Sequence, residues 1–335
     1  MHVAVSGLGT TGLQIANLVS KLPAISGLRL YDPKPDRLAI ARATIDAAID
    51  IYEAPPTGHH PVAPTPTIAF LAGPVQSQVS VARDLVDSGC HVVSISDGIE
   101  DVRGLIRLDQ MAIANRVTVV VGAGFCPGLS GLLVAYGVAQ LDSVEAINVA
   151  TTGTGGPACA RQHHQAIKNS GLEWIDGQWS PRRGRSGRDL VWFPEPIGAS
   201  DCYRAALASP LLVQQAFPLT NRIGARMSAN RRDSLTSRLP MLRRPHLDGG
   251  PGAIRVEIRG RVASRVETKI FGVAASPSTA AATTATLSAE SIIDGSFPPG
   301  AYGLASAPEP SELLATLHGS GIVVSSFDGY LQTAH

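Results

Sequence analysis

Three glycines near the start of the chain could hold a phosphate group. Gly7, Gly9 and Gly12 form the pattern G-x-G-x-x-G, which follows an apolar segment at 2–7 and opens a helical pattern. Glycines let the main chain approach a pyrophosphate, and the free N–H groups of a helix N-terminus attract its negative charge. Because glycine makes up 34 of the 335 residues, the spacing alone could be an ordinary turn. Its place between a strand and a helix predicts a dinucleotide-binding turn instead.

The predicted contacts with the dinucleotide continue to an aspartate. We expect the turn to bind it through Gly7, Leu8, Gly9, Thr10, Thr11 and Gly12. Asp32 lies twenty residues after Gly12, at the end of the next apolar segment, where it would bind the two adenosine ribose hydroxyls of NAD. A carboxylate about 4 Å from the 2′-phosphate of NADP would cost up to roughly 4 kcal/mol at an effective dielectric of about 20.

Two basic residues after Asp32 could oppose this repulsion. Lys34 and Arg37 are the candidates. As exposed partners of the 2′-phosphate, each would stabilise bound NADP by only about 0–1 kcal/mol. The sequence therefore predicts NAD rather than NADP, although a bidentate contact of Arg37 with the phosphate would be stronger than this figure.

Cys126 stands in the stretch VGAGFCPGLSG, residues 121–131, between a glycine-rich turn and Pro127. Its thiol could be a nucleophile, a proton donor or a small side chain that fills a tight corner. A helix beginning at Pro127 and Gly128 could lower the pKa of the thiol, and the proline would fix the backbone of its first turn. The sterically simplest interpretation is that the thiol fills the space between the turn and the cofactor.

His163 and His164 are candidates for moving a proton, because histidine titrates near neutral pH. If their segment is helical, the two side chains point in different directions, so at most one should face a substrate. Either could also be an ordinary surface or core histidine.

Arginines in the same region could bind the carboxylate of an amino acid-like substrate, since guanidinium binds carboxylates in a bidentate way. They are Arg161, Arg182, Arg183, Arg185 and Arg188. We select Arg161 and Arg183 as substrate-binding residues, and a solvated basic loop is the alternative. Trp174, Trp179 and Trp192 are expected in the core or in the wall of a pocket.

Strands and helices alternate over the first 124 residues. We expect strands at 2–7, 28–32, 67–73, 90–96 and 117–124, and helices at 11–22, 35–49, 75–89 and 100–116. This alternation is typical of a parallel sheet with crossover helices. After Gly124 we expect a helix at 129–141, a strand at 144–153, irregular sequence to about 205, a hairpin at 253–274, a tightly packed helix at 274–293, and a helix and a strand within 308–329.

The segment 69–136 resembles the saccharopine dehydrogenase-like family, which includes saccharopine reductases and lysine 6-dehydrogenases. The similarity rests on an apolar strand with a small-residue turn, AFLAGP, then HVVSIS at 91–96, and then a glycine-rich turn with Pro-Gly that leads into a helix. It extends over roughly residues 1–140. Weaker similarities are GTGGPA at 153–158 and the C-terminal stretches PPGAYG and PEPSELLATLHGSGI.

The resemblance implies an α/β fold with two domains. An N-terminal Rossmann domain with a doubly wound parallel sheet would cover residues 1–125, and a mixed α/β substrate domain would cover 126–335, with a C-terminal helix packing back on the first domain. The sheet of the second domain would form the interface of a homodimer.

The resemblance also implies hydride transfer between NAD(P) and a C–N bond of a small amine or amino acid derivative. It places Gly73, Pro74 and Gln76 beside the cofactor and Ser96 and Asp97 near the nicotinamide. We add Gly124 and Phe125, from the turn before Cys126, as further cofactor-binding candidates. Such a reaction needs a group that moves a proton, for which Asp97 is our first choice. Its alternative role is to cap the helix that begins near Glu100.

The chain departs from saccharopine reductases at three positions of the resemblance. Cys126 replaces the aspartate of their L-D-P-G, Asp97 replaces a tyrosine, and Thr154, our third substrate-binding candidate, replaces a cysteine before the Gly-Gly turn. The proton-handling groups therefore differ. Two other functions stay open: a dehydrogenase acting on an alcohol or aldehyde, and a catalytically silent NAD-binding sensor.

The composition and net charge of the chain argue against several other kinds of protein. The net charge of +1 argues against a nucleic-acid or membrane partner, and there is no apolar run of roughly 18 residues, as a membrane helix requires. The four cysteines form no C-x-x-C pair, so we expect neither a metal nor a disulfide framework. With the first strand starting at His2, no signal peptide is expected. We therefore expect a cytoplasmic enzyme with a small-molecule substrate.

Overall fold

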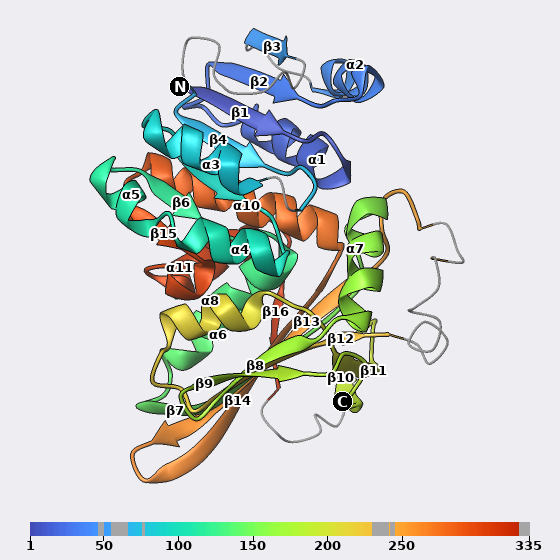
Figure 1. The fold of residues 1–335 in the computed structure, drawn as a ribbon, viewed down its shortest axis with the longest axis vertical. Helices are drawn as coiled ribbons and strands as arrows, with labels where there is room; N and C mark the ends of the chain where they lie inside the picture. The colour runs from blue at the N-terminus through green and yellow to red at the C-terminus, as the bar shows by residue number, and fades with distance from the viewer. Residues whose placement is uncertain (46–49, 55–65, 76–77, 230–240, 242–244, 328–335) are drawn as a thin grey trace.

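The computed structural model describes residues 1–45, 50–54, 66–75, 78–229, 241 and 245–327. Within these residues, seven strands form the first sheet, in the order β15-β6-β5-β4-β1-β2-β3 (Figure 1). The strands are β1 (His2–Ser6), β2 (Gly27–Tyr31), β3 (Asp50–Ala54), β4 (Ile68–Leu71), β5 (His91–Ser94), β6 (Thr118–Val120) and β15 (Gly300–Tyr302). All neighbours pair in parallel.

Helices connect these parallel strands. They are α1 (Thr10–Val19), α2 (Pro35–Thr44), α3 (Gln78–Asp87), α4 (Ile99–Ile106) and α5 (Asp109–Ala114). The chain runs outward from β1 to β3 and then returns to β4 on the other side of β1, so the sheet is doubly wound and has a topological switch point between β1 and β4. This confirms the predicted Rossmann-type α/β fold.

The central strands of this sheet are buried on both faces. All four residues of β4 are buried, as are the three central residues of β1. A parallel strand covered by helices on both sides reads as a continuous apolar run. This is why β1 and β4 could be located in the sequence, whereas β3 and β15 were not predicted.

The C-terminal part of the chain returns to the first sheet. β15 pairs with β6, and α10 (Pro277–Ile293) packs against α1 (Figure 1). Thirteen of the seventeen residues of α10 are buried, most of them Ala, Ser or Thr. These short side chains let α10 approach α1 closely, as the predicted tightly packed helix requires.

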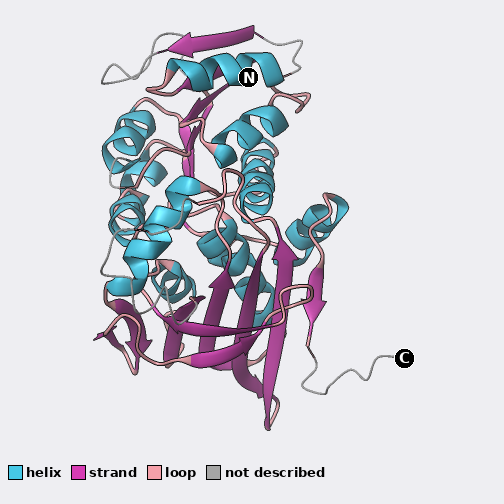
Figure 2. Cartoon of the chain, turned by 90° about the vertical axis from the view of Figure 1, so that its right-hand side faces the viewer, coloured by secondary structure: helices cyan, strands magenta, loops and turns pink. Residues whose placement is uncertain are grey.

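A second sheet of nine strands follows the order β10-β11-β12-β7-β13-β14-β16, with β8 and β9 attached beside β12. The strands are β7 (Ser143–Thr152), β8 (Gly171–Ile175), β9 (Gln178–Arg182), β10 (Asp189–Trp192), β11 (Ala199–Arg204), β12 (Arg222–Ser228), β13 (Gly252–Val262), β14 (Arg265–Ala275) and β16 (Val324–Ser326). β12 and β7 pair in parallel and the other pairs are antiparallel, so the sheet is mixed as predicted. Figure 2 shows its long strands at the end of the molecule away from the N-terminus.

Helices α6 (Ser130–Val138), α7 (Pro157–Lys168), α8 (Ser209–Ala216) and α11 (Pro310–Gly319) complete the second part. The short turn η1 (Phe125–Leu129) immediately precedes α6, and η2 (Leu304–Ser306), from the C-terminal part of the chain, also contacts it. The predicted hairpin at 253–274 is confirmed by the pairing of β13 with β14.

Three expectations about elements were wrong. The region up to about 205 is regular: it contains α7 and β8 to β11, whose short strands carry so many polar side chains that no apolar run marks them. The single helix expected at 100–116 is two helices, α4 and α5. Trp192 is 63% exposed on edge strand β10, whereas Trp174 and Trp179 pack edge to face in the β8–β9 hairpin.

No helix in the part of the chain that the structure describes is both long and apolar enough to span a membrane.

Candidate active site

The glycine-rich turn lies at the carboxyl end of β1. Gly7 has a φ of +91°, a conformation that L side chains rarely adopt, and a Cβ there would lie 2.6 Å from the backbone nitrogen of Gly73. A Cβ on Gly12 would collide with the carbonyl oxygen of Gly7. These two glycines therefore let β1, α1 and the loop after β4 pack together.

Other glycines at the same edge of the sheet border open space. A Cβ on Gly9, which immediately precedes α1, would meet no described atom within 4 Å, and the same holds for Gly73 after β4. Gly9 is the N-cap residue of α1, and no side chain caps the first N–H groups of this helix. The main chain is thus accessible at the switch point, where open α/β sheets bind their ligands. This arrangement fits the pyrophosphate of a dinucleotide.

Asp32 ties the turn to the end of β2. Its Oδ2 accepts a hydrogen bond from the backbone N–H of Leu8 at 2.7 Å, and its Oδ1 accepts one from the N–H of Lys34 at 2.9 Å. Arg37 Nη1 forms an ion pair with Oδ2 at 3.2 Å. The carboxylate is buried. Arg37 therefore neutralises the group on which the predicted preference for NAD depends.

The remaining predicted cofactor residues that the structure describes follow β4, β5 and β6. The Ser96 hydroxyl, which is buried after β5, donates to Asp101 Oδ2 at 2.9 Å. Gly124 and Phe125 form the start of the turn before α6, and Phe125 is buried. Pro74 follows Gly73 directly, and Gln76 lies outside the described residues.

Asp97 does not cap α4. The residue before α4 is Gly98, and no side chain caps this helix. Instead, the Asp97 carboxylate faces α7, where Gln162 Nε2 donates to Oδ1 and His163 Nε2 lies 3.3 Å from Oδ2. The side chains of Asp97 and His163 are 22% and 15% exposed. The structure thus brings together two predicted proton carriers from distant parts of the chain.

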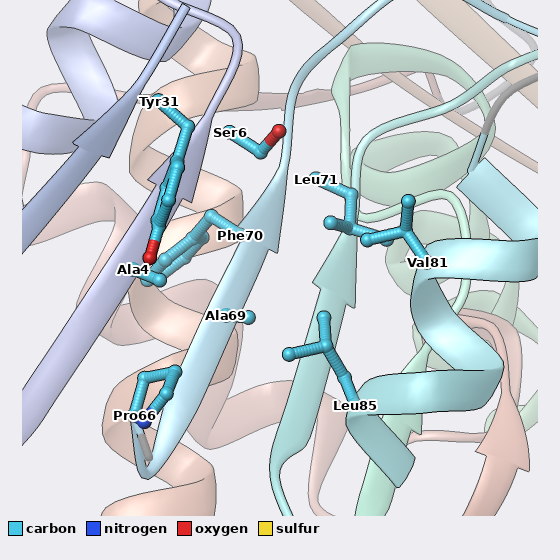
Figure 3. Close-up of a pocket in the computed structure, with 9 residues that line it drawn as sticks. All are labelled: Ala4, Ser6, Tyr31, Pro66, Ala69, Phe70, Leu71, Val81 and Leu85. Carbon is cyan, nitrogen blue, oxygen red and sulfur yellow. The ribbon is translucent and has the colours of Figure 1, made fainter. Parts of the chain in front are cut away.

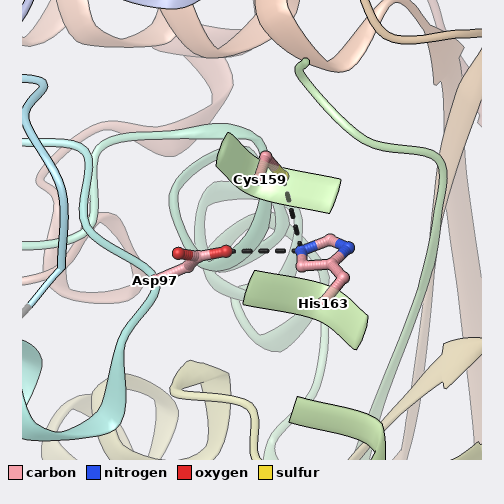
Figure 4. A group of neighbouring side chains, drawn as sticks. All are labelled: Asp97, Cys159 and His163. Carbon is pink, nitrogen blue, oxygen red and sulfur yellow. Dashed lines mark hydrogen bonds and ion pairs between the residues drawn. The ribbon is translucent and has the colours of Figure 1, made fainter. Parts of the chain in front are cut away.

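His163 also contacts a cysteine on its own helix. Cys159 precedes it by four residues, so both side chains lie on one face of α7, with Sγ 3.6 Å from His163 Nε2 (Figure 4). Burial alone would lower the pKa of His163, but the Cys159 thiol and the Asp97 carboxylate outweigh it and raise that pKa well above the usual value. His164 is one residue further along the helix, about 100° around its axis, and belongs to a different face.

Cys126 lies at the turn before α6, in contact with two hydroxyl groups. Its Sγ is 3.1 Å from Ser209 Oγ and 3.4 Å from Ser130 Oγ. Burial raises the pKa of the Cys126 thiol despite these hydrogen bonds, and the nearby charges of His163 and Asp97 act on it in opposite directions. Desolvation is thus the dominant influence on the pKa of this thiol, which the N-terminus of the following helix could have lowered.

The arginines of this region divide into two groups. Arg182 pairs with Glu173 at 3.2 Å, and Arg188 pairs with Asp201 at 2.9 Å. Arg161, on α7, and Arg183, after β9, are exposed. Thr154 lies in the turn between β7 and α7, where its carbonyl oxygen is close to Gly249. A role of Arg161, Arg183 or Thr154 in substrate binding stays a prediction.

A small pocket lies away from these residues, between β1, β2, β4 and α3 (Figure 3). Tyr31, Phe70, Leu71 and Val81 are among its lining residues, which are mostly apolar. The lining includes none of the predicted site residues.

Two residues of the site were not predicted, namely Cys159 and Gln162. The signal that could have found them is the spacing C-x-x-x-H from Cys159 to His163. It has meaning only on a helix, and the helix was missed although Pro157 follows the Gly-Gly turn, a common position for proline at a helix start.

Comparison with known proteins supports the fold. No protein-family model matches the chain. Its structure resembles apo saccharopine dehydrogenase (L-Glu forming) from Saccharomyces cerevisiae, with a TM-score of 0.71 and 11% identity over 97% of this chain and 99% of that one. The resemblance to the saccharopine dehydrogenase-like family is thus confirmed as a likeness of fold.

Two further structures match at lower TM-scores. Corynebacterium glutamicum DAP dehydrogenase in complex with DAP has a TM-score of 0.49 and 14% identity, covering 95% of this chain and 98% of that one. An engineered D-amino acid dehydrogenase bound to NADP+ has a TM-score of 0.46 and 13% identity, covering 95% and 98%.

Proposed function

We propose that the protein is an NAD(P)-dependent oxidoreductase that acts on a C–N bond of a small amine or amino acid derivative, by imine reduction or amine oxidation. The observation that carries this proposal is the contact between Asp97, in the loop after β5, and His163 on α7. β5, β4 and β1 are adjacent parallel strands, so Asp97, Gly73 and Gly9 follow strands whose carboxyl ends meet at one edge. A dinucleotide that starts at Gly9 and passes Gly73 would extend toward Asp97.

The bound cofactor would supply or accept the hydride, and the residues of this chain would handle the proton. In imine reduction, the carbon receives a hydride and the nitrogen receives a proton. His163 would donate that proton from Nε2, because its raised pKa keeps it protonated near neutral pH. Asp97 Oδ2, which lies 3.3 Å from the same nitrogen, would balance the positive charge of the ring until the Nε2 proton moves to the substrate, while Gln162 fixes the other carboxylate oxygen. In amine oxidation the reverse step would start from the neutral form of His163, whose Nε2 would accept the proton.

Several finer features belong to this proposal. Asp32 favours NAD over NADP, to an extent that the ion pair with Arg37 limits. The four cysteines are free, which supports a reducing compartment such as the cytoplasm. We also infer a carboxylate-bearing substrate and a homodimer built on the second sheet, for which light scattering should give about twice the chain mass of 34.9 kDa.

Turnover measurements test the proposal. Oxidation of NADH and NADPH is followed with keto acids paired with ammonia or amines, and reduction of NAD+ and NADP+ is followed with amines and amino acids. Alcohols and aldehydes form the comparison class. We expect turnover with the first two groups and a loss of about 10²–10⁴-fold in His163→Gln. Turnover only with alcohols or aldehydes, or cofactor binding without any turnover, would contradict it.

A further inference from the structure

We propose that Asp97, Cys159 and His163 form a binding site for a zinc ion, with a fourth coordination position open for water or another ligand. The three side chains come from the loop after β5 and from one face of α7 (Figure 4). The proposal concerns metal binding and does not depend on the proposed function.

The donor atoms converge on one point. The carboxylate oxygen, the thiol sulfur and the imidazole nitrogen lie within 4.8 Å of one another. With Zn–S of about 2.3 Å, Zn–N of about 2.05 Å and Zn–O of about 2.0 Å, a tetrahedral ion separates sulfur from nitrogen by about 3.6 Å and nitrogen from oxygen by about 3.3 Å. The structure has 3.6 Å from Cys159 Sγ to His163 Nε2, and 3.3 Å from His163 Nε2 to Asp97 Oδ2.

A nucleophilic Cys-His-Asp relay does not match this arrangement. Such a relay uses both ring nitrogens, one facing the nucleophile and the other facing the carboxylate. Here the same nitrogen, Nε2, faces both Cys159 and Asp97. One N–H group cannot be directed at both partners, whereas a lone pair on Nε2 can be directed at an ion between all three.

Neighbouring contacts preorganise the ligands. Gln162 binds Asp97 Oδ1, which orients the carboxylate and leaves Oδ2 for the ion, as the outer partners of metal ligands generally do. Cys159 and His163 are four residues apart within the twelve-residue helix α7, which fixes their spacing. The Cys126 thiol, which contacts Ser209 and Ser130, is not part of the group.

The chemistry of the donors selects the ion. Thiolate and imidazole suit zinc, whereas magnesium and calcium prefer oxygen ligands. A thiolate and a carboxylate also balance the charge of a divalent cation. Three protein ligands with partly exposed side chains leave one position open, as in catalytic rather than structural zinc sites.

Zinc binding and the proposed proton transfer exclude each other at His163. The ion needs the lone pair of Nε2, which carries the proton in the proposed reaction. Binding therefore releases the thiol proton and any proton on Nε2 to the solvent. Metal binding can be measured without a nicotinamide cofactor or a substrate, so failure of this proposal is distinguishable from failure of the proposed function.

The test is a metal titration of the full chain after removal of metal with a chelator. Zinc is titrated against a chromophoric competitor, and cobalt is titrated separately as a spectroscopic probe of a thiolate bond. We expect one ion per chain and a thiolate-to-cobalt charge-transfer band. Gln162→Ala, which removes a partner of a ligand rather than a ligand, should weaken zinc binding by about 10–100-fold. Cys159→Ser removes a ligand itself, so it should abolish the charge-transfer band and weaken zinc binding by at least about 100-fold.

Two matched controls should leave the metal titration unchanged. His164→Gln removes the adjacent histidine on another face of α7, and Cys126→Ser removes the nearest thiol outside the group. His163→Gln serves as a second ligand variant if Cys159→Ser fails to fold, as judged by circular dichroism. Absence of stoichiometric zinc binding in the wild-type chain, or binding that survives both ligand variants, would overturn the proposal.

Discussion

His163 Nε2 lies 3.3 Å from Asp97 Oδ2, although the two residues are 66 positions apart in the chain. The contact joins the loop after β5, in the first sheet, to α7, which follows the first strand of the second sheet. It places a titratable pair after β5, the strand next to β4, at the edge of the first sheet where we propose that a dinucleotide binds. The consequences for activity, cofactor choice and thiol chemistry can be tested separately.

Replacement of Asp97 should impair turnover without affecting the cofactor. Asp97→Asn removes the charge that holds His163 while keeping the shape of the side chain, so we expect kcat to fall by about 10²–10⁴-fold. The dissociation constants of NADH and NADPH, measured by fluorescence, should stay within about twofold. Glu100→Gln is the matched control, because it removes a nearby carboxylate that is exposed and pairs only locally with Arg103. Equal activity of the two variants would contradict the role of Asp97.

Cofactor choice should depend on the balance between Asp32 and Arg37. We expect the wild-type protein to bind NADH at least about tenfold more tightly than NADPH, a difference of about 1.4 kcal/mol. Arg37→Ala should widen this difference, because it removes the cation nearest to Asp32. Fluorescence titration with both cofactors measures it. Tighter binding of NADPH in the wild type, or an unchanged ratio in Arg37→Ala, would show that these two charges do not set the preference.

Two alanine substitutions in the glycine-rich turn should affect different properties, one the stability of the fold and the other the affinity for the cofactor. Gly12→Ala places a Cβ against the carbonyl of Gly7 and should destabilise the fold by about 1–3 kcal/mol. Gly9→Ala places its Cβ in open space at a φ of −70°, so stability should stay within about 0.5 kcal/mol. The same methyl group would enter the space assigned to the pyrophosphate and lower NADH affinity at least about tenfold.

Urea denaturation and NADH titration of both variants distinguish these effects. If Gly9→Ala binds NADH as tightly as the wild type, the cofactor does not pass over this residue. If Gly12→Ala is as stable as the wild type, the close approach of α1 to the turn is not required.

Cys126 should act as a structural thiol. Burial raises its pKa, so the reactive thiolate fraction at pH 7–8 should be lower than for an ordinary cysteine, whose pKa is about 8.5, and alkylation should accelerate only at higher pH. Mass spectrometry after iodoacetamide treatment at several pH values measures this. Cys126→Ser and Cys126→Ala should keep kcat within about tenfold of the wild type. A loss of about 10²–10⁴-fold with folding intact would instead identify Cys126 as the proton carrier.

The sequence predicted the elements that are apolar throughout and missed those that depend on neighbours. β1, β4 and β5 could be located because helices cover both faces of the sheet, so the central residues of each strand are apolar and buried. β15 has only three residues and exists because it pairs with β6. β10 is an edge strand with exposed Leu190 and Trp192, a pattern that hydrophobic periodicity does not identify.

The candidate site shows the same limit. The turn at Gly7 to Gly12 and Asp32 are separated by a fixed distance along one β-α-β unit, so spacing alone could identify them. Asp97 and His163 were named separately, but their contact requires the position of α7 relative to β5, which no local pattern encodes. Cys159 was missed for a related reason, since its significance depends on helix α7, which was not predicted.

Transfer of a labelled hydride tests the central claim most directly. The wild-type chain is incubated with NADH or NADPH deuterated at the transferred C4 position, together with keto acids and ammonia or amines, and the products are analysed by mass spectrometry. We predict deuterium on the carbon bonded to nitrogen in an amine product. We also predict that the Asp97→Asn and His163→Gln variants do not form this labelled product. Deuterium found only in alcohol products, or in no product although the cofactor binds, would contradict the assignment of a C–N oxidoreductase.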